Sequence, residues 1–285
     1  MKKFIILLVL ALFLVTNVSA ERNKVYTVAM TDISYHKPEK STVSSVLGAL
    51  LDASAGQVTI DKGKYVNAVR AKVLQGLGGA YRIRVIDGQF KPEEVAEDGS
   101  CLYADGVLTN ISTTQREEAV NKEKKTTKIT YKAQVSVTLN LKNARTDAVV
   151  HSATFSVSDY DCSWVETSEG AIVNALNRLS VKIRNHFNRV YPLSASIIEG
   201  ASEKKDKQKE VYIDLGSPSG AYVGMHMKVY IVKTIAGKEA KKEIGKLKIS
   251  EILGDEISLC KVQKGGSDIK DALDAGEHVV VSSID

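Results

Sequence analysis

The chain has 285 residues, of which 44% are hydrophobic and 26% charged, and its formal net charge is +5. This composition is typical of a folded globular protein and excludes an intrinsically disordered chain. The positive excess is small and no basic stripe alternates with aromatic residues, which argues against nucleic-acid binding.

The first 20 residues have the three parts of a secretory signal peptide. Lys2 and Lys3 form a basic start, apolar residues fill positions 4–15, and Val18-Ser19-Ala20 supplies the small residues that precede a cleavage site. The apolar run is shorter than the roughly 20 residues that span a bilayer. We therefore expect cleavage after Ala20 and a soluble periplasmic protein of about 265 residues without a transmembrane segment. No cysteine lies near the cleavage point, so a lipoprotein is not expected.

The region after the signal peptide predicts a crossover unit. Residues 25–30 alternate in hydrophobicity as a strand does, and residues 43–55 favour a short helix. Residues 65–75 predict a second helix with an apolar face that three glycines end, and residues 81–86 predict a strand. The helix face consists of Tyr65, Val69, Val73 and Leu77, and the glycines are Gly76, Gly78 and Gly79.

A long β region follows. Residues 102–114 predict one strand and residues 116–125 a polar turn. Residues 129–142 alternate most clearly, and residues 148–157 pair back on them through a turn at 143–147. Because one face of this sheet is apolar and the other polar, we expect it to be covered on one side only.

A long helix is predicted next. Ser163 with Glu166 forms a capping box, and Ser168 is a second possible start. Apolar residues form a continuous stripe from Ile172 to Val190, and the following Pro192 limits extension of the helix. We expect this stripe to cover the apolar face of the sheet.

The last third of the chain predicts a linker and a small barrel. Residues 200–210 are small and charged, which is typical of a flexible linker. Residues 211–285 contain five short glycine-punctuated segments that predict a closed or nearly closed β-barrel. The predicted strands are 211–215, 225–233, 244–253, 256–263 and 278–282.

The three cysteines allow one disulfide at most. Cys260 lies in a strand-like apolar run and is expected to be a buried thiol. Cys101 opens one strand-like segment and Cys162 closes another, so a Cys101–Cys162 disulfide is possible outside the cytosol.

Motifs that carry catalytic chemistry are weak in this sequence. The five histidines are scattered and none has zinc-motif spacing to another ligand. Gly216-Ser217-Pro218-Ser219-Gly220 has proline where a nucleophile elbow needs serine. Trp164, the only tryptophan, either packs at the strand–helix corner or contacts a partner protein. We therefore predict no enzyme activity, no cofactor and no metal site.

Residues 105–192 resemble the periplasmic domain shared by CsgG and LpoB. The resemblance rests on Asp105-Gly106-Val107-Leu108-Thr109, on the strand 131–139, and on the turn and strand 143–152. Asn143 stands where that group has aspartate, and Asp147 where it has glycine. Residues 211–285 resemble the small C-terminal β-domain of FlgT, a flagellar-motor protein, through Val211-Tyr212-Ile213-Asp214-Leu215-Gly216 and the glycine pattern that follows.

These resemblances imply an α+β fold. Residues 21–199 would form an α/β sandwich of the anticodon-binding-like type, a mixed sheet with helices, and residues 211–285 a small β-barrel. They imply a non-enzymatic binding or assembly factor that acts on other cell-envelope proteins, and they supply no catalytic residues. Alternatives are a subunit of a curli-like outer-membrane secretion assembly and an uncharacterised hydrolase.

Two departures from CsgG and LpoB stand out. Those proteins are lipoproteins, whereas this chain lacks the cysteine. CsgG also forms a pore from inserted hairpins, whose strands each need about 9–11 residues. The segment between Thr114 and Thr126 is too short and too charged for such a hairpin, so a pore is not expected.

Overall fold

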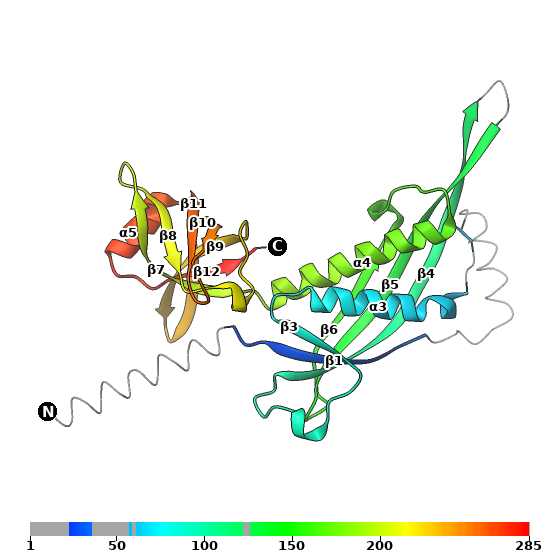
Figure 1. Cartoon of the computed structure of the whole chain (residues 1–285), viewed down its shortest axis with the longest axis horizontal. Helices are drawn as coiled ribbons and strands as arrows, with labels where there is room; N and C mark the ends of the chain where they lie inside the picture. Colours follow the sequence, from blue (N-terminus) through cyan, green and yellow to red (C-terminus); the bar gives the residue numbers. More distant parts are fainter. Residues whose placement is uncertain (1–22, 36–56, 59–60, 122–125, 285) are drawn as a thin grey trace. The chain divides into compact units, whose positions relative to one another are not determined.

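The computed structural model describes residues 23–35, 57–58, 61–121 and 126–284, so the predicted signal peptide and the helix predicted at 43–55 lie outside the described residues. The chain divides into two units (Figure 1). One is Tyr26–His186, here called the sheet unit; the other is Phe187–Asp285 with the described residues before Tyr26, here called the barrel unit.

The predicted crossover is confirmed in the sheet unit. Strand β1 (Tyr26–Ser34) is followed by helix α3 (Val66–Gly78) and strand β3 (Ile83–Asp87), and β1 and β3 pair in parallel. The short 3-10 helix η1 (Lys62–Tyr65) leads into α3. A parallel pair requires such a crossover, because a tight turn can join only antiparallel strands.

Helix α3 runs through two of the glycines that were expected to end it. Gly76 and Gly78 lie inside the helix, and Gly79 follows its last residue. At Gly76 a Cβ atom would lie only 2.8 Å from the carbonyl oxygen of Ser180 and 2.9 Å from Cβ of Ile183. Gly76 is therefore present because α3 packs closely there on helix α4 (Ser168–Val190), which outweighs the low helix propensity of glycine.

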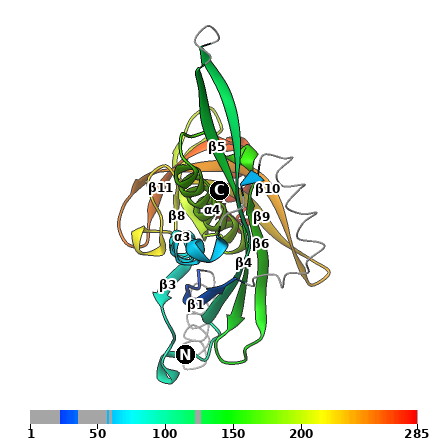
Figure 2. The same ribbon diagram turned by 90° about the vertical axis from the view of Figure 1, so that its right-hand side faces the viewer.

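The main sheet has the order β3-β1-β4-β5-β6, with the short β2 (Gln57–Val58) pairing with β4. Strands β4 (Cys101–Asn121), β5 (Thr126–Asn143) and β6 (Val149–Val157) are antiparallel. Helices α3 and α4 lie against one face of the sheet (Figures 1 and 2). The buried side chains of β5 lie on alternate residues, as its sequence pattern predicts. They are Ala133, Val135, Val137, Leu139 and Leu141.

The predicted turn at 116–125 is wrong. Strand β4 continues to Asn121 and β5 begins at Thr126, and they pair as far as Asn121 with Thr126. The described side chains here, residues 115–119 and 127–129, are exposed or half-buried, so strand pairing in this part of the hairpin does not require apolar residues.

Helix α4 (Ser168–Val190) begins at the later of the two predicted starts. Thr167 caps it, since its hydroxyl accepts a hydrogen bond from the Gly170 amide at 3.1 Å. The segment before it forms the 3-10 helix η3 (Asp159–Asp161), and then Val165 bridges to Tyr131 of β5. The apolar stripe is buried from Ile172 to Phe187.

The barrel unit is a closed six-stranded barrel of order β10-β11-β8-β7-β12-β9. The five predicted strands are present, and the structure adds β7 and helix α5 (Gly266–Asp274). Val211, Met227, Val229, Leu247 and Val281 are fully buried in it. The strands are β7 (Ser194–Glu203), β8 (Gln208–Ile213), β9 (His226–Ile235), β10 (Lys238–Ile252), β11 (Ser258–Lys264) and β12 (Val279–Ser283).

The flexible linker predicted at 200–210 is a β-hairpin of the barrel. Strands β7 and β8 pair across this segment, so the barrel begins at Ser194 rather than at Val211. Gln208 is buried, and its side-chain amide donates to the carbonyl oxygens of Ser202 at 3.0 Å and Glu210 at 2.7 Å. This buried amide satisfies two carbonyl groups near the polar outer end of the hairpin, while Ala195, Ile197, Val211 and Ile213 are buried nearer its base.

Candidate functional site

The far half of the β4–β5 hairpin is a two-stranded ribbon that extends past the rest of the sheet (Figure 1). Strand β6 pairs with β5 only from Val135 onward, and β2 reaches β4 only at Thr113 and Thr114. We call residues 115–121 and 126–131 the ribbon. Its exposed side chains include Arg116, Glu117 and Ile129.

Trp164 lies at the base of the ribbon. The Arg116 guanidinium stacks over its ring with 4.1 Å to the ring centroid, and the Lys132 ammonium lies 5.1 Å from the same centroid. Such cation–π contacts favour a fixed ring orientation. The indole is half-buried, so part of it stays accessible beside the ribbon. Its predicted contact with a partner stays a prediction.

The segment of residues 164–166, just before α4, makes contacts that connect the base of the ribbon to the start of that helix. Val165 and Tyr131 exchange backbone hydrogen bonds of 3.0 and 2.7 Å, and Lys128 forms an ion pair with Glu166. The Lys128 hydrogen bond and charge lower the pKa of Glu166 below its ordinary value. The ribbon therefore has a defined direction at its base.

The sheet face opposite α3 and α4 is polar, and no helix of the described residues covers it (Figure 2). Hydroxyl pairs cross from β5 to β6, with Ser136 2.6 Å from Ser156 and Thr138 2.8 Å from Thr154. These hydroxyl groups hydrogen-bond to one another across the two strands, which stabilises the pairing of β5 with β6 on this polar face.

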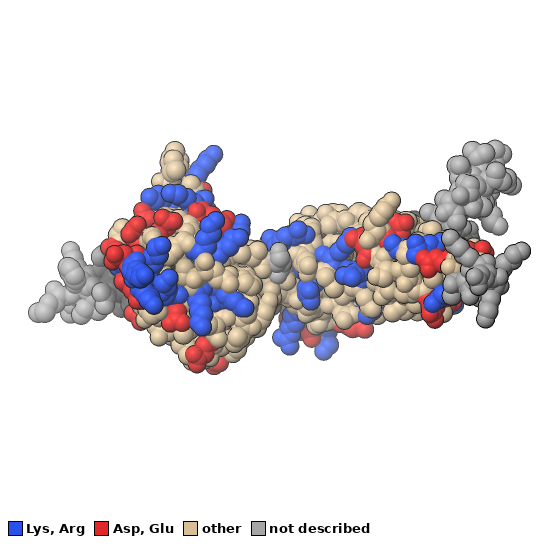
Figure 3. Space-filling view, turned by 90° about the horizontal axis from the view of Figure 1, so that it is seen from above, with Lys and Arg blue, Asp and Glu red and all other residues tan. Residues whose placement is uncertain are grey.

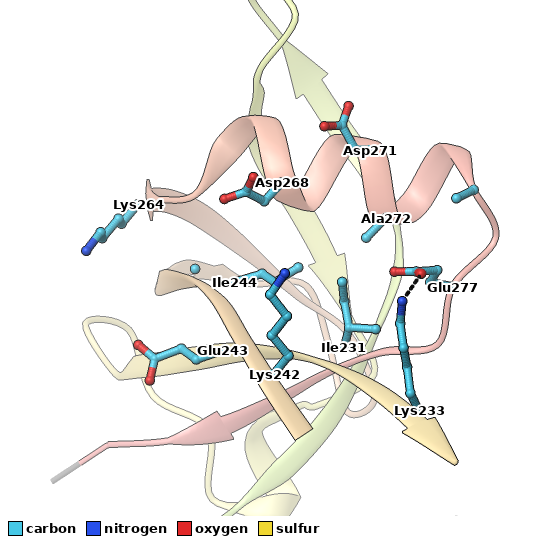
Figure 4. Close-up of a pocket in the computed structure, with 12 residues that line it drawn as sticks. Ile231, Lys233, Lys242, Glu243, Ile244, Lys264, Asp268, Asp271, Ala272 and Glu277 are labelled. Atoms are coloured by element: carbon cyan, nitrogen blue, oxygen red, sulfur yellow. Dashed lines mark ion pairs between the residues drawn. The ribbon is translucent and has the colours of Figure 1, made fainter. Parts of the chain in front are cut away.

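The barrel unit holds a cleft of about 550 Å³ between α5 and strands β9 and β10 (Figure 4). Ile231, Ile244 and Ala272 form an apolar floor. Lys242 and Asp268 point into the cleft from opposite sides. An ion pair of 2.8 Å between Lys233 and Glu277 closes one end.

The three cysteines are free, buried thiols, so the predicted Cys101–Cys162 disulfide is wrong for this structure. The strand register places Cys101 beside the end of β5 and Cys162 near its start, roughly 30 Å apart at about 3.3 Å per residue. A disulfide needs Cα atoms within about 7 Å. Burial raises the pKa of Cys162 and raises that of Cys260 to about 12, so neither thiol is a ready nucleophile.

Two histidines that are distant in sequence meet in the sheet unit. Nε2 of His151 on β6 lies 2.8 Å from Nε2 of His186 on α4, and the Phe155 ring stands edge-on to His186. Burial lowers the pKa of His151. In the part of the chain that the structure describes, no group of three or more His, Cys, Asp or Glu side chains is placed to hold a metal ion.

Charged side chains of both signs are interspersed on the face of each unit shown in Figure 3. Among the described residues, no helix is both long and apolar enough to cross a membrane.

Some residues of these candidate sites can be identified from the sequence, and others cannot. Trp164 stands out as the only tryptophan, but the cleft residues Lys242 and Asp268 do not, because composition and periodicity did not predict α5. The spacing of Ile269 and Ala272, the two buried residues of α5, is the available signal for that helix.

No family model and no curated protein matches the chain. Among solved structures, it is similar to a putative neuraminyllactose-binding hemagglutinin homolog from Helicobacter pylori, with 15% identity over 59% of this chain and 83% of that chain and a TM-score of 0.25. It is similar to PelC from Paraburkholderia phytofirmans, crystallised as a dodecamer, with 15% identity over 56% and 87% of the two chains and a TM-score of 0.29.

The protein XCC0632 from Xanthomonas campestris is a third such structure, with 12% identity over 59% and 83% of the two chains and a TM-score of 0.32. None of these similarities is close enough to establish a shared function.

Proposed function

We propose that the protein is an exported periplasmic binding or assembly factor without enzyme activity, and that it contacts another cell-envelope protein through the ribbon of β4 and β5. The observation that carries this proposal is the extension of the hairpin beyond every neighbouring strand of the described sheet. The signal-peptide pattern of residues 1–20 supports the compartment.

The ribbon is energetically unusual on its own. A two-stranded ribbon with solvent on both faces is at best marginally stable, because it buries little apolar surface. Its exposed charges, such as Glu117 and Lys128, discourage pairing with arbitrary strands. A ribbon with these properties gains stability from a partner with matching polar groups, which favours specific contact with a protein.

Preorganisation at the base supports the same role. Trp164, Val165 and Glu166 hold the two strands where they leave the sheet. A partner that binds the ribbon then loses less conformational freedom on association, which raises affinity. The accessible part of the half-buried Trp164 indole would extend the contact surface onto the sheet.

The proposal includes the relationship to the periplasmic domain of CsgG and LpoB, with an anticodon-binding-like sandwich in the sheet unit. It also includes the relationship of the barrel unit to the small domain of FlgT. Both relationships rest on patterns of strands, turns and glycines in the sequence, and both imply action by protein contact.

A shortened ribbon tests the proposal. Replacing residues 117–129 by Asn-Gly joins Arg116 to Thr130, which are direct cross-strand partners, through a two-residue turn. We expect the tagged wild-type chain to recover a reproducible partner from envelope extract and the shortened chain to lose it.

A matched control shortens a different hairpin. Replacing residues 204–207 of the β7–β8 hairpin by Asn-Gly leaves the ribbon unchanged, and recovery of the partner should persist. Equal recovery by the shortened-ribbon and wild-type chains would contradict the proposed role of the ribbon.

A further inference from the structure

Strand β10 leaves the barrel with one edge unpaired. The outer part of β10, residues 238–245, pairs with β9, whereas pairing of β10 with β11 begins only at Lys246, whose partner is Lys264. Within the described residues no strand therefore pairs with the other edge of residues 238–245. An open edge of this kind presents backbone N–H and C=O groups to any chain that lies beside it.

Helix α5 stands close to this edge. Gly265 has φ of +80°, and a Cβ atom there would lie 1.9 Å from the carbonyl oxygen of Ile244. The glycine lets the chain turn from β11 directly into α5 against β10. The helix and the outer part of β9 and β10 then form the two walls of the 550 Å³ cleft (Figure 4).

The cleft has an apolar floor and charged walls. Its floor is apolar, formed by Ile231, Ile244 and Ala272. Lys242 and Asp268 face it from opposite walls, and neither has an ion-pair partner among the described residues. Opposite charges held apart in this way complement a ligand that carries both an acidic and a basic group.

We infer that this cleft binds an extended peptide segment of a partner protein, which adds to the open edge of β10 and lies between β10 and α5. Main-chain hydrogen bonds along the edge of residues 238–243, about 20 Å long at about 3.3 Å per residue, provide affinity. An apolar side chain of the peptide rests on Ile231 and Ile244, an acidic one meets Lys242 and a basic one meets Asp268. This binding is independent of the ribbon in the sheet unit.

A displayed library of random linear peptides, selected on the immobilised full chain, provides the probe. We expect enriched peptides to carry an apolar residue between an acidic and a basic one. Lys242→Glu and Asp268→Lys should each weaken binding of a synthetic enriched peptide roughly fivefold or more, as loss of a favourable charge contact does. Methylation of alternate backbone nitrogens of that peptide should abolish binding, because strand addition needs the N–H groups.

A control variant tests whether the loss of peptide binding is specific to the residues of the cleft. Lys241→Glu changes the neighbouring exposed lysine, which does not line the cleft, and should leave the affinity within about twofold. The inference fails if no enriched peptide depends on Lys242 and Asp268. It also fails if N-methylated peptides bind equally well, or if free amino acids compete as strongly as the peptide, since those results indicate a small-molecule site.

Discussion

Gly76 controls how closely α3 approaches α4. Because a Cβ atom there would meet the Ser180 carbonyl at 2.8 Å, we expect Gly76→Ala to destabilise the sheet unit by about 1–3 kcal/mol. This loss would occur although alanine favours helix by roughly 1 kcal/mol. The free energy of unfolding, measured by urea denaturation, checks the prediction.

The neighbouring glycine is a natural control. At Gly78 a Cβ atom would lie 3.6 Å from Val85, an ordinary contact. Gly78→Ala should therefore be neutral or stabilise by up to about 1 kcal/mol. If both variants lose stability equally, helix packing is not the reason for Gly76.

The His151–His186 contact should make the sheet unit sensitive to acid. The two Nε2 atoms lie 2.8 Å apart, so only one of these two facing nitrogens can carry a proton, which it donates to the other. Burial also lowers the pKa of His151 below its ordinary value of about 6.5. The unfolded chain then binds more protons than the folded one as the pH falls below about 6.5. The stability from this group is complete above that pH and is lost progressively toward the lower folded pKa.

Replacement of one ring tests this pH dependence. The unfolding free energy of His151→Gln should fall less than that of the wild type between about pH 7.5 and about pH 5. Parallel pH profiles for the two proteins would show that the histidine pair has no role in acid sensitivity.

At the outer end of the β7–β8 hairpin, the buried Gln208 side chain makes specific hydrogen bonds that stabilise it. Gln208→Ala removes the donor to the carbonyls of Ser202 and Glu210 and should cost about 1–3 kcal/mol. The exposed neighbour Lys209 offers a control, since Lys209→Ala should stay within about 0.5 kcal/mol of wild type. Thermal unfolding monitored in the barrel unit checks both, and an unchanged Gln208→Ala protein would favour the flexible linker expected from composition.

The elements that the sequence predicted are those with one buried face. Strand β5 and helix α4 alternate or repeat in hydrophobicity because one side of each packs on the other elements of the sheet unit. The described side chains of the ribbon are mostly exposed, and so are those at the outer end of the β7–β8 hairpin, residues 198–207. These two stretches therefore resemble loops in sequence and carry no clear period. The ends of these strands are determined by pairing with a neighbouring strand, and the local hydrophobic pattern does not predict that pairing.

The candidate sites were harder to predict for a related reason. Trp164 is conspicuous as a residue type, but its partners Arg116 and Lys132 come from strands that only the hairpin register brings together. Lys242 and Asp268 belong to different elements of the barrel, and α5 has only two buried residues to indicate a helix. The Cys101–Cys162 disulfide that the sequence allowed is not formed because Cys101 lies beside the end of β5 and Cys162 lies near Tyr131, with most of the strand between them.

The whole molecule combines two separately organised units, each with its own strand system and core. The two proposals assign a different task to each unit: the sheet unit contacts an envelope protein through the ribbon, and the barrel unit receives an extended peptide. Both are contacts between proteins and neither requires a cofactor.

Photo-crosslinking in intact cells would decide whether the ribbon binds a partner. A benzoylphenylalanine at Glu117, on the exposed ribbon, should give a light-dependent adduct with an envelope protein. The same group at Val173, 54% exposed on α4, should give none. Adducts of equal yield at both positions, or an adduct at Val173 alone, would contradict a ribbon-based binding function.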